Sequence, residues 1–96
     1  MILRKNGREF YSLQITTTPA VTSGWQASFD GGTTWAAGAT ATVDGVPVVR
    51  WLVAGPTAPV DDTPVAATIT TSMRPLVRVT EAPEVVVRVA PSITLQ

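Results

Sequence analysis

Few residues of this chain could do chemistry, and one short window combines several of the residue types that could. Residues 27–35, with the sequence ASFDGGTTW, combine the carboxylate of Asp30 with several hydroxyls and the indole of Trp35, and Trp25 lies just upstream. Such residue types could bind a small ligand through hydrogen bonds and ring contacts. Aspartate and paired glycines are equally typical of a tight turn. The window is therefore either a ligand site or the tip of a hairpin.

Catalytic groups are scarce in the rest of the sequence. The chain contains no histidine and no cysteine, so the side chains that titrate closest to neutral pH are absent. Neighbouring carboxylates occur as Asp61 with Asp62 and as Glu81 with Glu84, and both pairs lie in proline-flanked turns. We expect these carboxylates to be solvated and not gathered in a cleft. The sequence therefore predicts no catalytic residue, and we expect that the protein is not an enzyme.

Metal and phosphate sites are not predicted either. Hard cations need several oxygen ligands from one loop, and the segments DGG, VDG and VDDT each supply one or two carboxylates without the EF-hand spacing. Gly31 and Gly32 do not continue into a phosphate-binding glycine motif. A single calcium ion at Asp61 and Asp62 is the one alternative, and no further ligand supports it. We expect no cofactor.

Length and charge limit the kind of protein. A chain of 96 residues fits one domain, residues 1–96, and buries about 60 to 65% of its unfolded surface, so assembly with other chains would add stability. The lack of cysteine excludes disulfides and favours a reducing compartment. Seven basic residues balance seven acidic ones, which argues against binding nucleic acid. No apolar stretch approaches the roughly 20 residues of a membrane helix, so we expect a soluble, unprocessed chain without a membrane partner.

Composition and alternation favour β-strands along the whole chain. Threonine and valine dominate, whereas good helix formers such as glutamate, lysine and leucine are scarce. The dipeptide Asn6-Gly7 predicts a type I′ hairpin between the β-capable segments on either side of it. In the second arm the face with Tyr11, Leu13 and Ile15 should point at the core.

Later strands are separated by turn signals at regular intervals. Asp44-Gly45 predicts another hairpin, and Pro47 lies either at the start of the following strand or on an edge strand. Residues 55–64 are expected to form an exposed Pro-rich loop, and residues 91–96 a C-terminal tail strand. The further strands are predicted at residues 25–29, 34–43, 46–54, 65–71, 75–80 and 84–90, and the segment 34–43 forms one or two short strands around Gly38. This pattern predicts an all-β fold, a small antiparallel sandwich or partly open barrel of about seven to eight short strands.

The opening window also carries a motif. Its residues match S-x-D-x-G-x-T-W and resemble an Asp-box, the hairpin motif repeated on the blades of sialidase-like propellers. In that family the boxes lie away from the catalytic centre, so the resemblance implies a structural turn. Its members here are Ser28, Asp30, Gly31, Gly32, Thr34 and Trp35. The chain has one copy and lacks a match to the family's catalytic arginines, acid and tyrosine.

Simple physical chemistry supports the same turn. Asp30 can accept hydrogen bonds from the amides just ahead of it, and Gly31 and Gly32 allow positive φ. Trp35 can fold its ring over the turn, and the hydroxyls of Ser28 and Thr34 can pair across the two arms.

A carbohydrate-binding module is the alternative from a different class. Trp25, Trp35 and Trp51 would then form a stacking platform for sugar rings, and Asp30 would supply a polar contact. Exposure of the indoles discriminates, since a scaffold buries them. A weaker third option is an Ig-like surface module that adheres to a host envelope.

A wider resemblance covers the whole chain. Its size, its cysteine-free Thr/Val/Pro/Ala-rich make-up, the Ala54-Gly55-Pro56 loop and the ending EAPEVVVRVAPSITLQ resemble small virion proteins of tailed phages that infect actinobacteria. The resemblance implies a structural subunit in many copies, placed first in the head-to-tail connector and second in capsid decoration. Its partners would be identical neighbours and portal, capsid or tail proteins. The protein would reside in the virion after assembly in the host cytoplasm.

Charged segments are the candidate contacts with those partners. The basic start of the chain and the acidic pair in the loop carry opposite signs, and complementary charge would set the register between neighbours. Strand addition along an open sheet edge would contribute affinity. The candidate interface residues are Arg4, Lys5, Arg8, Asp61, Asp62, Arg78 and Arg88.

Overall fold

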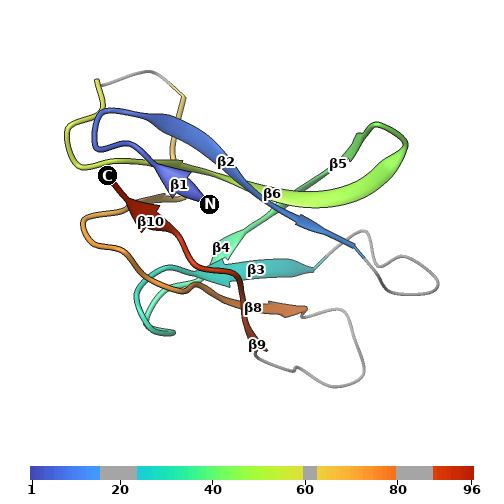
Figure 1. Ribbon diagram of the computed structural model, residues 1–96. Coiled ribbons are helices and arrows are strands. Elements are labelled where there is room, and N and C mark those ends of the chain that lie inside the picture. Colours follow the sequence, from blue (N-terminus) through green and yellow to red (C-terminus); the bar gives the residue numbers. More distant parts are fainter. Residues whose placement is uncertain (16–23, 60–62, 80–87) are drawn as a thin grey trace.

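The computed structural model describes residues 1–15, 24–59, 63–79 and 88–96. Those residues form two β-sheets that pack face to face, with a short third pair of strands at one end (Figure 1). Within the described ranges there is no helix. The predicted all-β sandwich is therefore confirmed.

The first sheet is built around one long central strand. β6 (Val46–Ala54) lies between β2 (Arg8–Gln14) and β5 (Ala39–Val43), both antiparallel to it, and β7 (Ala67–Thr68) pairs with its far end in parallel. Its alternate residues Val49, Trp51 and Val53 are buried, as the period of a strand requires. Since β6 is central, Pro47 lies at the start of an interior strand and the edge-strand alternative is wrong.

The second sheet has the order β4-β3-β8-β9. Its strands are β3 (Trp25–Ser28), β4 (Ala36–Ala37), β8 (Leu76–Val79) and β9 (Arg88–Val89), and all pairings are antiparallel. Ala27 and Val77 lie opposite one another in the register and are both buried. They form this sheet's contribution to the core between the layers.

The two sheets are joined through a glycine. The chain leaves β4, passes Gly38 and enters β5, so it changes sheets at that residue. A Cβ at Gly38 would lie 2.5 Å from Val49 Cγ2 and 2.8 Å from the ring of Trp51. Only glycine fits this crossing, because buried side chains occupy the space a larger residue would need.

The first and last strands pair with one another. β1 (Ile2–Leu3) and β10 (Thr94–Leu95) are parallel, and Leu3 and the neighbouring Ile93 are fully buried. The Lys5 amide donates to the carbonyl of Gln96 at 2.8 Å and extends the pair. The two ends of the described chain are therefore fixed side by side.

This pairing makes the predicted Asn6-Gly7 hairpin wrong. The amide of Gly7 donates to the carbonyl of Arg4 at 2.9 Å, so Lys5 and Asn6 are the central residues of the turn. Neither has the positive φ of a type I′ turn. Burial of Leu3 against β10 draws the first strand away from β2. By contrast, Asp44 and Gly45 have φ values of 51° and 77°, which confirms the second hairpin.

Strand number and direction also differ from expectation. The described residues contain ten strands, more than predicted, because half of them are only two residues long. Two pairings are parallel, β1 with β10 and β6 with β7. Short strands of this kind have too little alternation to be read from sequence.

The loop at residues 55–64 is only partly exposed. Pro56, Thr57 and Pro64 lie at the surface, but Gly55 is buried, and a Cβ there would overlap the backbone carbonyl of Lys5. The amide of Gly55 donates to the carbonyl of Gly7. The start of this loop is thus packed against the first turn of the chain.

Aromatic side chains connect the two layers of the core. The indole of Trp51 donates from Nε1 to the carbonyl of Ala36 at 2.9 Å, and Tyr11 meets Phe29 edge to face at 6.1 Å. Tyr11 and Ile15 are buried and Leu13 packs against them, which confirms the predicted inner face of β2. These contacts fix how the sheets are positioned relative to one another.

Candidate functional site

Asp30 is the centre of hydrogen bonding in the turn between β3 and β4. Its Oδ1 accepts from Ser28 Oγ at 2.7 Å and from the Thr34 amide at 2.9 Å, and its Oδ2 accepts from Thr34 Oγ1. Ser28, which is fully buried, also accepts from the amide of Gly32 at 2.8 Å. The hydroxyls of Ser28 and Thr34 therefore bond to Asp30, and the expected pairing between them is wrong.

The two glycines of the turn serve its backbone conformation. Gly31 has a φ of 76° and Gly32 a φ of 100°, and nothing lies near the position of a Cβ at Gly31. The requirement is thus one of dihedral angle and not of space. A Cβ at Gly32 would approach the ring of Trp35 at 4.0 Å, so the indole lies close to the turn.

The turn also determines the charge of Asp30. Hydrogen bonds from Thr34 above all, and from Ser28, lower the pKa of this carboxyl from 3.8 to about 2. A group with so low a pKa is ionised at neutral pH and is a poor proton donor or acceptor. Its donors are all within its own hairpin, so the arrangement is that of a structural acceptor.

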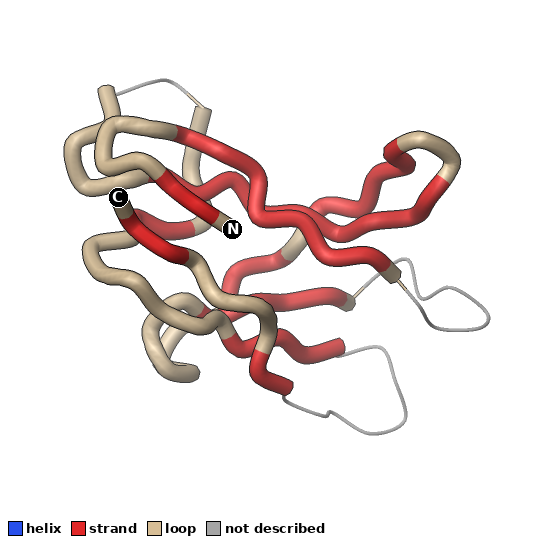
Figure 2. Tube along the Cα trace, in the orientation of Figure 1, coloured by secondary structure: helices blue, strands red, loops and turns tan. Residues whose placement is uncertain are grey.

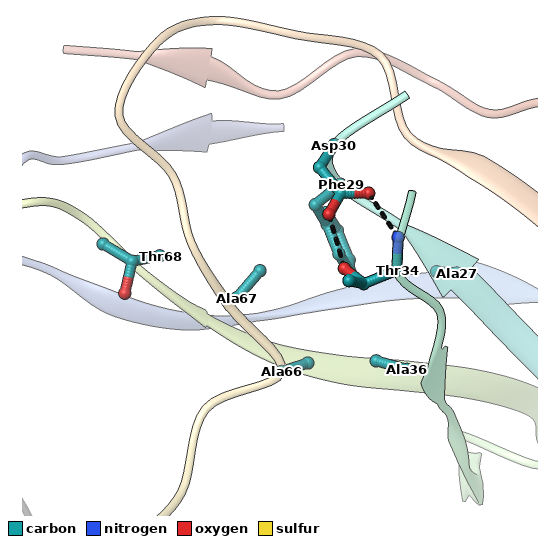
Figure 3. Close-up of a pocket in the computed structure, with 8 residues that line it drawn as sticks. All are labelled: Ala27, Phe29, Asp30, Thr34, Ala36, Ala66, Ala67 and Thr68. Carbon is teal, nitrogen blue, oxygen red and sulfur yellow. Dashed lines mark hydrogen bonds between the residues drawn. The ribbon is translucent and has the colours of Figure 1, made fainter. Parts of the chain in front are cut away.

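A small pocket lies beside this turn (Figure 3). It has a volume of about 220 Å³ and is lined by Ala27, Phe29, Asp30, Thr34, Ala36, Ala66, Ala67 and Thr68. Figure 3 shows both carboxylate oxygens of Asp30 bonded to Thr34, with Ala66, Ala67 and Thr68 on the opposite side. Over the described residues, no cluster of three potential metal ligands occurs. The pocket therefore contains one carboxylate, that of Asp30, which is already bonded within its turn, and otherwise mostly methyl groups.

Trp35 is covered on one side by a cation. The guanidinium of Arg78 lies 4.0 Å from the centroid of its ring, and Arg78 Nε donates to Gln26 Oε1 at 2.8 Å. Gln26 and Arg78 are opposite one another in the register of β3 and β8. Arg78, a candidate interface residue, is thus held by partners in its own chain.

The three indoles do not form one exposed platform. Trp51 is only 2% exposed, and its N–H is bonded to Ala36. Trp25 is half-buried and packs against the core, and Trp35 has Arg78 over its ring. Trp51 therefore cannot stack on a sugar. The carbohydrate-binding alternative would have to rely on Trp25 and Trp35, whose rings are both partly covered.

The basic start of the chain is an ordered surface. Arg4 and Lys5 are exposed, and with Asn6, Thr57 and Gln96 they line a shallow depression of about 410 Å³. Their turn is bonded on both sides, because the Thr57 amide donates to the Lys5 carbonyl and the Lys5 amide donates to Gln96. Arg4 and Lys5 are therefore brought together on a rigid support.

The other charged candidates are placed differently. Arg8 donates from Nη1 to the carbonyl of Thr63 at 3.0 Å, so it contacts the end of the predicted loop of its own chain. Asp61 and Asp62 lie outside the described residues. Arg88 is in β9 opposite Val77, and its side chain is not among those described.

No protein-family model, curated protein or solved structure matches this chain. The likeness to Asp-box hairpins and to phage virion proteins therefore stays a prediction, and the function has to be argued from geometry. Within the described ranges, no helix is long and apolar enough to cross a membrane.

The sequence did not predict the surface formed by Phe10 and Arg50. Phe10 is 51% exposed, and the guanidinium of Arg50 lies 4.2 Å from its ring centroid. Both residues line an open groove of about 390 Å³ with mostly apolar walls. A signal was present, because Phe10 shares a strand face with the polar residues Ser12 and Gln14. A phenylalanine on a polar strand face predicts that its ring is exposed.

Proposed function

We propose that this chain is a non-enzymatic structural subunit of a tailed-phage virion, a head-to-tail connector component that binds identical neighbours and portal, capsid or tail proteins. The observation that carries this proposal is the exposed Phe10 ring, stacked with the half-buried Arg50 at an apolar groove. Aromatic residues and arginine are the types enriched where protein interfaces gain most of their affinity. The resemblance of the whole chain to phage virion proteins supplies the class of assembly.

The use of polar groups also supports a scaffold. The carboxylate of Asp30 accepts hydrogen bonds from its own turn. The indole N–H of Trp51 and the hydroxyl of Tyr11 donate to backbone carbonyls. These groups stabilise the sandwich from within. Such use suits a rigid block that presents surfaces to neighbours.

An open sheet edge gives a second mode of contact. The amide of Ile15 donates to the carbonyl of Pro47, so the odd-numbered residues of β2 bond to β6 and the even-numbered residues direct their backbone groups away from it. In the part of the chain that is described, β6 is the only strand paired with β2. A strand of another protein could add along Phe10, Ser12 and Gln14.

The test is the mass of the purified protein in solution by light scattering, alone and mixed with portal, capsid and tail proteins. The proposal expects complexes of defined stoichiometry with at least one of them. Binding to the portal or to a tail protein would indicate the connector, and binding only to assembled capsids would indicate a decoration protein. A protein that ignores all of them contradicts the proposal. A response of its tryptophan fluorescence to glycans would then favour the carbohydrate-binding alternative.

A further inference from the structure

The apolar groove lies at a gap in the pairing of β6. On one side of this strand β5 pairs up to Arg50, and β7 begins to pair only at Val53. At the two residues between, Trp51 and Leu52, this edge lacks a strand partner, although the amide of Ala66 donates to the Leu52 carbonyl at 2.7 Å. The groove opens at this place and is lined by Phe10, Ala36, Ala37, Ala39, Arg50, Trp51, Leu52, Thr63, Pro64, Val65 and Ala66.

Arg50 gives the groove a positive charge. Its guanidinium stacks on Phe10, and in the described part of the chain no ion pair joins it to a carboxylate. A guanidinium keeps its charge at any physiological pH and presents several N–H donors in one plane. The occupant that suits this groove therefore combines an apolar side chain with a neighbouring carboxylate.

The tip of the β5–β6 hairpin has this combination. Val43 is 47% exposed, and Asp44 beside it is also exposed. The left-handed conformation of Asp44, with a φ of 51°, holds the carboxylate at the turn. Figures 1 and 2 show this hairpin extending past the ends of β3 and β8, away from the body of the sandwich.

Tip and groove cannot meet within one molecule. Asp44 and Arg50 lie on the same hairpin, six residues apart, which corresponds to about 20 Å along an extended strand. The tip can therefore reach such a groove only on another copy. The two surfaces differ, so such a contact is heterologous and repeats from copy to copy into a ring or a helical chain.

We infer that the hairpin tip at Val43 and Asp44 of one copy docks in the groove of the next copy, with Asp44 facing Arg50 and Val43 against the apolar lining near Phe10. This inference rests on the proposed function, because it names the surfaces through which identical subunits would bind one another. Opposite charge fixes the register, and the apolar contact supplies affinity.

The decisive experiment uses two charge reversals, Asp44→Arg and Arg50→Glu, analysed by sedimentation velocity over a range of protein concentrations. The wild-type chain should self-associate. Each variant alone juxtaposes like charges at the contact, so its dissociation constant should rise at least about tenfold. An equimolar mixture should regain assembly, because the reversed tip meets the reversed groove and the native tip meets the native groove.

Further variants separate the contact from effects on folding. Arginine is unfavourable at the positive φ of Asp44, whereas Asp44→Asn removes the charge and retains a residue that this turn accepts. Asp44→Asn should therefore weaken self-association with an unchanged circular dichroism spectrum. Arg74→Glu is the matched control, since Arg74 is exposed and does not line the groove, and it should assemble like the wild type.

The outcomes distinguish this inference from the proposed function. Variants that assemble as well as the wild type, or a wild-type chain that stays monomeric, would overturn the inference, and binding to virion proteins would still support the proposed function. Assembly that is rescued only in the mixture would support the inference even if no virion protein binds, and the proposed function would then fail. Arg50-dependent binding of a virion protein to a monomer would show a different occupant and overturn the inference.

Discussion

Asp30 holds its turn with both carboxylate oxygens, and this makes the stability of the hairpin depend on pH. The hydrogen bonds from Thr34 and Ser28 lower the pKa of Asp30 to about 2 from 3.8. The folded state thus binds this proton more weakly than the unfolded state. The stabilisation is present above about pH 4 and is lost as the pH falls towards about 2.

We predict that Asp30→Asn lowers the melting temperature at neutral pH and that the difference from the wild type shrinks between about pH 4 and about pH 2. Thermal unfolding followed by circular dichroism measures it. The control is Glu9→Gln, which removes an exposed carboxylate outside the turn. A difference that stays constant down to pH 2 would contradict the role assigned to Asp30.

Gly38 is the second residue on which the fold depends. A Cβ there would be in close contact with Val49 and Trp51, and both are buried and unable to move aside. We predict that Gly38→Ala lowers the free energy of unfolding by about 1–3 kcal/mol, as overpacking of a core does. Urea denaturation measures the change. In contrast, Gly31→Asn should cost less than about 1 kcal/mol, because asparagine tolerates a positive φ and the space beside Gly31 is open.

At the scale of elements, the sequence predicted the strand faces and turns that are determined by residues next to one another in the chain. Alternation identified the inner face of β2, and Asp44-Gly45 identified the hairpin into β6, because both depend on neighbours in the chain. The parallel pairing of β1 with β10 could not be predicted in this way. It depends on the burial of Leu3 and Ile93, which are distant in sequence.

The same distinction applies to the candidate site. The residues of the Asp30 turn could be named because the motif is contiguous, but the stacking of Arg78 on Trp35 follows from the register of β3 against β8. The groove at Phe10 and Arg50 likewise needs β2, β6 and the segment 63–66 to come together. No local pattern contains that information.

Tyr11 ties β2 to the segment that precedes β10. Its hydroxyl donates to the carbonyl of Pro91, and burial raises the pKa of Tyr11 to about 12. We predict that Tyr11→Phe costs about 1 kcal/mol at neutral pH, the usual value of one hydrogen bond. Hydrogen exchange should show faster opening at Ile93 and Gln96, whose amides hold the last strand.

The raised pKa gives this prediction a second test. The unfolded chain loses the Tyr11 proton near pH 10 and the folded chain only near pH 12, so the wild type should lose stability as the pH rises through this interval. The Tyr11→Phe variant lacks this group and should lose less over the same interval. Parallel alkaline unfolding curves would contradict the assignment.

At the scale of the whole molecule, the sandwich is a block with different surfaces at separate places. Arg4 and Lys5 lie on the bonded turn near the chain ends, whereas Phe10 and Arg50 lie at the groove of the first sheet. Under the proposed function, separate surfaces would let the chain bind identical copies through one and a different protein through another. This arrangement agrees with the proposed place between virion components.

We predict that replacing Arg4 and Lys5 together by glutamate weakens the proposed binding to a virion protein at least about tenfold and reverses its dependence on salt. Folding should be unaffected because both side chains are exposed. Arg8 is left unchanged, since its guanidinium bonds to the carbonyl of Thr63. Binding is measured by light scattering of the mixture, with Arg74→Glu as the control. Unaltered binding would remove the charged turn from the interface.

The parallel pair of β1 and β10 has a mechanical consequence. A load that pulls Met1 and Gln96 apart acts in opposite directions along the two paired strands, so their hydrogen bonds are stretched together in shear. These include the bonds from Thr94 to Met1, from Gln96 to Leu3 and from Lys5 to Gln96. Bonds loaded in parallel resist far more force than bonds opened one after another. A chain tethered through both ends would therefore transmit tension across this pair of strands while its core stays unloaded.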